Sequence, residues 1–82
     1  MQKFHLTVAK LDKELYSKEA VSLTVPAENG EMTILAHHTA TLAKLKPGKA
    51  IIKEDENKDP VEIELEKGIL EFSNNSANLM LF

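Results

Sequence analysis

Three glutamates at alternate positions, Glu62, Glu64 and Glu66, form a row of groups that could exchange protons with a substrate. General acid–base catalysis needs two such carboxyls in different environments, both close to one reacting atom. Residues two apart on an extended strand point to the same side, and the positions between these glutamates are apolar. The row therefore predicts the solvent-facing side of a β-strand, and we assign it no acid–base role.

The adjacent residues His37 and His38 are the first candidates for metal ligands. Neighbours on a strand point to opposite faces, so the two imidazoles would not bind one ion together. His5 is distant in the sequence, and a third ligand from it has no support in the spacing. We predict no metal site: one histidine faces outward, and the other packs or forms a hydrogen bond at an interface.

The remaining reactive groups do not form a catalytic set. The chain has no cysteine, and no serine lies in a G-x-S-x-G sequence that would expose it as a nucleophile. Its three glycines, Gly30, Gly48 and Gly68, are too far apart to form a phosphate-binding loop. We therefore predict no catalytic residue, no bound cofactor and no enzymatic activity.

One strongly charged segment, Lys53–Asp59, has the sequence KEDENKD. Its carboxylates could in principle bind a cation. A calcium loop, however, needs oxygen ligands at alternate positions, a central glycine and a terminal glutamate, and this segment lacks that pattern. We predict a solvated hairpin tip.

Composition excludes several kinds of partner. The net charge is −3, and the ten basic residues, all lysine, are scattered, so no nucleic-acid partner is expected. No segment approaches the roughly 20 apolar residues of a spanning helix, so membrane contact is expected only through partner proteins. A length of 82 residues predicts a single domain over residues 1–82.

Alternation of apolar and polar residues predicts β-strands over most of the chain, most clearly at residues 4–8, 21–25 and 61–65. Further strands are predicted at residues 13–17, 32–36, 40–46, 49–54, 69–73 and 77–82. Gly, Pro, Asn and Asp separate these segments, which indicates an all-β sandwich or barrel without a helix of ten residues or more. The predicted core consists of Phe4, Leu6, Val8, Val21, Leu23, Val25, Ile34, Val61, Ile63, Leu65, Phe72 and Leu79.

A helical turn is the alternative for Thr39–Lys46, because Leu42 and Leu45 are three residues apart among good helix formers. The segment is short, and Pro47 with Gly48 ends it. A helix of that length is marginal without tertiary support, so the strand is favoured.

The motifs of the chain resemble, in order and spacing, those of the epsilon subunit of F-type ATP synthases (delta in mitochondria). The matching motifs are Phe4-His5-Leu6, Val25-Pro26, Gly30-Glu31-Met32, Ile34-Leu35 followed by His38, Leu42 with Leu45, Pro47-Gly48, Gly68 to Phe72, and Asn78 to Leu81. The chain departs from the family's usual residues at Ala27, Ala36, Ala40 and Lys67. The family typically continues into a C-terminal helical hairpin that is absent from this sequence, and the sequence does not decide whether the chain is naturally short or trimmed.

The resemblance implies a flattened two-sheet β-sandwich of short, mostly antiparallel strands that serves as a non-catalytic rotor subunit. Its implied partners are the gamma subunit, the polar loops of the c-ring and the rest of the ATP synthase. Its implied location is the cytoplasmic side of a bacterial cell membrane, as a peripheral protein. A free-standing β-sandwich that binds an unrelated protein is the alternative.

The resemblance also implies two interfaces. The implied c-ring interface is the turn made by Glu28, Asn29, Gly30, Glu31 and Met32, for which an ordinary hairpin tip is the alternative. The implied gamma interface consists of His38, Thr39, Thr41 and Ala43, with Lys10 on an adjacent strand. Local packing of a short loop is the alternative for this second set.

Overall fold

The computed structural model describes residues 1–82 as nine β-strands without a helix, which confirms the all-β prediction. The strands are β1 (Phe4–Lys10), β2 (Lys13–Ala20), β3 (Ser22–Ala27), β4 (Gly30–Leu35), β5 (Thr41–Leu45), β6 (Gly48–Lys53), β7 (Val61–Leu65), β8 (Gly68–Ser73) and β9 (Ser76–Leu81). No helix long and apolar enough to cross a membrane is present.

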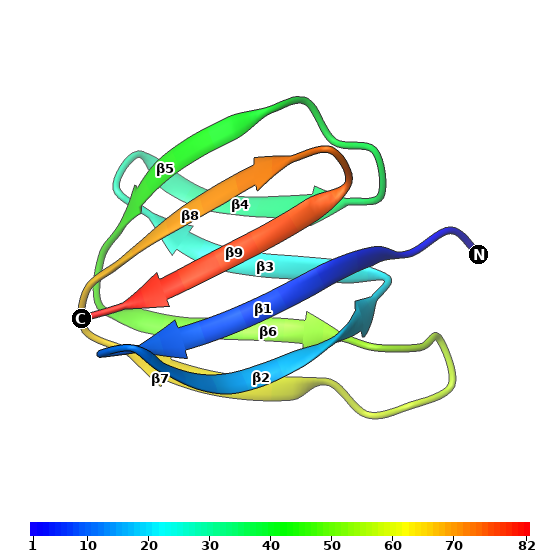
Figure 1. Cartoon of the computed structure of the whole chain (residues 1–82), viewed down its shortest axis with the longest axis horizontal. Coiled ribbons are helices and arrows are strands. Elements are labelled where there is room, and N and C mark those ends of the chain that lie inside the picture. The colour runs from blue at the N-terminus through cyan, green and yellow to red at the C-terminus, as the bar shows by residue number, and fades with distance from the viewer.

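The strands form two layers that share one hydrogen-bonded sheet (Figure 1). One layer has the strand order β2-β1-β9-β8-β5, and the other has the order β4-β3-β6-β7. A single backbone pairing, Ala27 with Leu45, joins β3 to β5 and so connects the layers. Every pair is antiparallel except β1 with β9. The predicted two-sheet sandwich of mostly antiparallel strands is thus confirmed.

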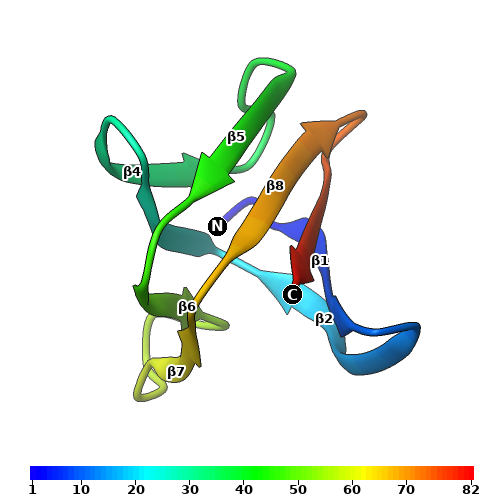
Figure 2. The same cartoon turned by 90° about the vertical axis from the view of Figure 1, so that its left-hand side faces the viewer.

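The chain passes between the layers along one long, bent hairpin (Figure 2). The run β5–β6 pairs with the run β7–β8, and the two runs are interrupted opposite each other, at residues 46–47 and 66–67. Gly68 lies buried at this bend, where a Cβ atom would come within 2.9 Å of the carbonyl oxygen of Met80. The absence of a side chain therefore lets two backbones approach closely.

The core lies between the layers as a cluster of 17 buried residues. All of the predicted core residues are buried except Val61 and Ile63, which are partly exposed. Both lie on β7, whose only partner is β6, so one side of this strand is open to solvent. The buried apolar side chains that the prediction missed are those of Ala20, Ala27, Leu45, Ala50, Ile52, Leu70, Ala77 and Leu81.

Two local predictions need correction. The segment 13–17 is part of a longer strand that continues to Ala20. His37 and His38 do not lie on a strand, because the chain turns at Ala36 and His37, where His37 adopts a φ of 63°. The segment 41–45 is a strand, as favoured over the helical turn.

The charged segment lies in the loop between β6 and β7, and residues 56–60 of this loop are exposed, as predicted for a hairpin tip. Glu54, the first carboxylate of the segment, differs from these exposed residues because it is largely buried. The side chain of Glu54 is 14% exposed and accepts a hydrogen bond from the Tyr16 hydroxyl of β2 at 2.5 Å. Glu54 therefore ties the edge of one layer to the end of a strand in the other.

Candidate partner-binding surfaces

The turn predicted to contact the c-ring is the tip of the β3–β4 hairpin. Ala27 pairs with Gly30, so Glu28 and Asn29 form a two-residue turn. Gly30 adopts a φ of +128°, a region that favours glycine. The carboxylates of Glu28 and Glu31 are exposed and form no ion pair within the chain. Both are therefore available to a cationic partner.

His38 is positioned by the loop between β4 and β5. Its Nδ1 lies 2.8 Å from the carbonyl oxygen of Thr39, and a carbonyl only accepts, so Nδ1 carries the proton. Its ring meets Phe72 edge-on, with 5.9 Å between ring centroids. Thr41 also donates to the Thr39 carbonyl, at 2.7 Å. The ring is thus fixed, and its Nε2 has no partner in the chain and can accept a hydrogen bond.

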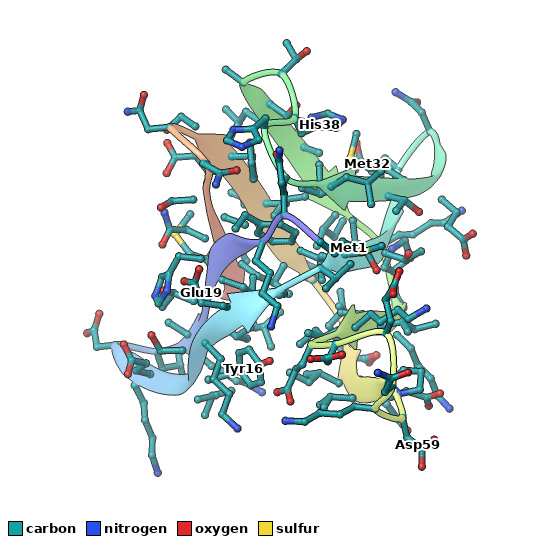
Figure 3. The ribbon with its side chains drawn as sticks, turned by 90° about the vertical axis from the view of Figure 1, so that its right-hand side faces the viewer. Met1, Tyr16, Glu19, Met32, His38 and Asp59 are labelled. Atoms are coloured by element: carbon teal, nitrogen blue, oxygen red, sulfur yellow. The ribbon has the colours of Figure 1, made fainter.

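A groove brings most of the two predicted interfaces together. It has a volume of about 410 Å³ and lies between the β3–β4 hairpin and β5. One wall is residues 27–32, and the other is residues 41–44. Met32, which is half-buried, contributes an apolar surface to the first wall. His38 and Met32 lie on the same side of the molecule (Figure 3).

Lys10 does not join this surface. It lies at the end of β1, and β9 and β8 separate β1 from β5, so the expectation of an adjacent strand was wrong. The ladder places Lys10 level with Leu81, Gly68 and Leu45, at the opposite end of β5 from Thr41. It lines a different hollow, with Glu64 and Glu66. Strand order depends on long-range pairing, so this separation was not predictable from local patterns.

Two groups with displaced pKa values lie away from the groove, on the loop after β6. The hydrogen bond from Tyr16, followed by the charges of Lys18 and Lys58, holds the pKa of Glu54 below its usual range. The backbone N–H of Asn57, followed by the charge of Lys3, lowers the pKa of Asp55. These carboxylates act in local structure, because each has a partner within the chain.

Sequence reasoning missed Leu42, which is 75% exposed and lies between Thr41 and Ala43 on the groove wall. Its neighbour in the ladder is Glu71, on the outer face of β8. The alternation itself could have found it: if Leu45 faces the core, Leu42 on the same strand faces outward. Leu42 therefore adds an exposed apolar side chain to the wall of the groove.

Comparison with known proteins agrees with the architecture. The sequence model of the family described as ATP synthase, delta/epsilon chain, β-sandwich domain, matches residues 3–81. The chain belongs to this family. It is 36% identical over 80 residues to the ATP synthase epsilon chain of Pelagibacter ubique, covering 96% of this chain and 60% of the relative. It is 32% identical over 78 residues to the epsilon chain of Protochlamydia amoebophila, covering 94% of this chain and 52% of the relative.

Solved structures show the same fold. A chain of the Euglena gracilis mitochondrial ATP synthase, in an assembly that includes the c-ring, superposes with a TM-score of 0.89 at 20% identity. The match covers 96% of this chain and 50% of that chain. A chain of the Tetrahymena thermophila mitochondrial ATP synthase, described as central stalk and c-ring, gives 0.79 at 20% identity, with 99% and 64% covered. The present chain thus spans about half the length of several relatives that it matches.

Proposed function

We propose that this chain is a non-catalytic central-stalk subunit of an F-type ATP synthase. It holds the gamma subunit on the c-ring and so couples ion translocation to the synthesis or hydrolysis of ATP. It is a peripheral component at the cytoplasmic side of a bacterial membrane, held there by its partner subunits. Membership of the delta/epsilon family supports this role. The two relatives described above, which match over most of this chain, are ATP synthase epsilon chains.

The observation that carries the proposal is the continuity of the groove surface. The tip at Glu28–Met32 and the strand segment 41–44 form two walls of one hollow. A chain that joins two partners needs two surfaces on a rigid support. The buried cluster between the layers supplies that support, because close-packed interiors resist deformation. Torque can then pass through the domain without being absorbed by it.

We assign the hairpin tip to the c-ring and the β5 side to the gamma subunit. Exposed Glu31 can pair with a cationic loop of the ring; one such pair contributes only about 0.2–1 kcal/mol, so it orients more than it binds. His38, Thr39, Thr41 and Ala43 form the gamma side, where small residues permit close approach. A stable interface buries about 800 Å² on each partner, so further residues contribute on both sides.

Binding to the gamma subunit tests the proposal. In calorimetric titration, the chain should bind the gamma subunit of its own complex, and His38→Ala should weaken binding about tenfold, because a side chain already held in place loses little freedom on binding. Lys58→Ala, in the loop between β6 and β7, is the matched control and should bind as the wild type. Wild-type chain that does not bind gamma would favour a free-standing module with another partner.

A further inference from the structure

The two layers expose four strand edges, at β2, β5, β4 and β7, and two of these edges are protected against pairing with another chain. The register of β2 shifts opposite Val8 and Ala9, and the strand carries four charged residues. Pro60 lies directly before β7, and within the strand Glu62 and Glu64 alternate with apolar residues. Charges, prolines and bulges are the usual means by which proteins prevent unwanted strand addition.

The edges of β4 and β5 carry less of this protection, because each has one charged residue and no proline. β4 contains no proline or lysine and a single charge, Glu31, near its hairpin end. β5 contains a single charge, Lys44, near its other end, and its remaining residues are apolar or threonine. The hairpin end of β4 and the open edge of β5 both line the groove described above.

The backbone of β5 presents unpaired groups to this groove. The carbonyl of Lys44 accepts from the Glu28 N–H at 3.0 Å, and the Lys46 N–H donates to Pro26 at 2.9 Å, so even-numbered residues here point away from β8. Backbone groups alternate in direction along an antiparallel ladder. The N–H and C=O of Leu42 and the N–H of Lys44 therefore also point away from β8, toward the groove. None of these three groups is among the backbone hydrogen bonds that lie outside the ladders.

Two features favour β5 over β4 as the binding edge. Leu42 is 75% exposed, so a strand beside it would gain an apolar cross-strand contact. The open run on β5 is also continuous with the surface assigned above to the gamma subunit.

We propose that the edge of β5 binds an extended segment of the gamma subunit, which adds to the five-stranded layer as a sixth strand. The added strand lies in the groove, hydrogen-bonded to the backbone of Leu42 and to the N–H of Lys44, with Met32 on its other side. Main-chain hydrogen bonds then supply affinity, and the apolar groove walls supply specificity. This inference rests on the proposed function, because it takes the gamma subunit as the partner.

Proline substitution separates backbone pairing from side-chain contact. Leu42→Pro removes an outward-pointing N–H, and proline is tolerated at such edge positions, so the fold should persist, as thermal unfolding can verify. We expect Leu42→Pro to weaken gamma binding by about tenfold or more, because a hydrogen bond is lost and the ring blocks the incoming strand. Leu42→Ala keeps the N–H and should cause a smaller loss. Thr33→Pro, on the facing edge of β4, is the matched control and should bind as the wild type.

Amide hydrogen exchange provides a second readout that needs no variant. In the free chain, the N–H groups of Leu42 and Lys44 should exchange quickly, and binding of the gamma subunit should slow both at least tenfold. The N–H of Thr33 should not be slowed. Unchanged exchange at Leu42 and Lys44 in a complex that does form, or equal gamma affinity of Leu42→Pro and wild type, would overturn strand addition while leaving the proposed function intact. Failure of the wild-type chain to bind gamma would reject both.

Discussion

Tyr16 shows how one side chain can connect the two layers. Its hydroxyl donates to Glu54 at 2.5 Å, and Lys18 and Lys58 lie 3.8 Å from the same carboxylate. The burial of Tyr16, with the hydrogen bond to Glu54, raises the pKa of its hydroxyl, so tyrosine remains the donor. Glu54 in turn stays ionised to lower pH than an unpaired glutamate, since its charge is stabilised.

Tyr16→Phe should lower the free energy of unfolding in a pH-dependent way. A carboxyl whose pKa is lowered by folding stabilises the fold above its unfolded pKa, about 4.3 for glutamate, and this contribution disappears as the pH falls through the folded pKa. The variant should therefore be less stable than wild type at pH 7, and the difference should shrink near pH 3. Guanidinium unfolding at the two pH values measures it. An equal difference at both would mean that the contribution of the Tyr16 hydroxyl does not depend on the ionisation of Glu54.

Truncation of core residues should follow burial rather than sequence pattern. Leu23 is fully buried, so Leu23→Ala should cost about 2–5 kcal/mol, a large share of the stability of a small domain. Ile63 on the edge strand is only partly buried, so Ile63→Ala should cost clearly less. Urea unfolding of both variants gives the comparison. Equal losses would show that β7 is more enclosed than its open edge suggests.

At the scale of elements, the bent hairpin β5–β6/β7–β8 determines how the layers meet. Gly68→Ala should destabilise the fold by about 1–3 kcal/mol, because the new methyl group would lie against the Met80 carbonyl and the Leu81 side chain. Gly30→Ala is a useful comparison, since a Cβ there meets nothing within 4 Å and only the φ of +128° is unfavourable. Thermal unfolding measures the loss of stability. Amide hydrogen exchange should show that crowding at Gly68 also loosens the pairing of β8 with β9, as faster exchange of the β9 amides. Unchanged exchange would locate the effect elsewhere.

The elements that sequence reasoning predicted well were those with strict alternation. β1, β3 and β7 repeat apolar and polar residues at period two, and this pattern alone defines a strand and its inner face. The prediction did not distinguish an edge strand from a central one, and so placed Val61 and Ile63 in the core. Alanines such as Ala20 were missed because a small side chain is compatible with either face.

The candidate site was predictable in part. The hairpin tip at residues 28–30 follows from its Asn and Gly residues, and its assignment to the c-ring came from the family resemblance. The strand order, which separates Lys10 from β5, depends on long-range pairing that no local pattern reports. The open backbone edge at Leu42 could not be predicted either, because it depends on which strands pair with β5.

At the scale of the whole molecule, the proposed interfaces and the charged loop lie apart. The β3–β4 tip lies at the left of Figure 1 and the β6–β7 loop at the right, so the two are separated along the longest axis of the molecule. Asp59, on the β6–β7 loop, lies far from both Met32 and His38 (Figure 3). The domain measures 30 × 24 × 23 Å, so a single substitution at one end should not disturb the other. Function can therefore be tested one end at a time.

The most direct test of the central-stalk role is ion pumping by an ATP synthase reconstituted in vesicles with this chain, its gamma subunit and the c-ring. Glu31→Lys reverses a charge at the proposed ring contact, so it should lower the ions pumped per ATP hydrolysed, measured at a gamma concentration that saturates the variant. Asp59→Lys is the matched charge reversal at the opposite end and should pump as the wild type. If Glu31→Lys pumps normally and Asp59→Lys uncouples, the opposite end of the sandwich faces the membrane, and the assignment of the two surfaces is wrong.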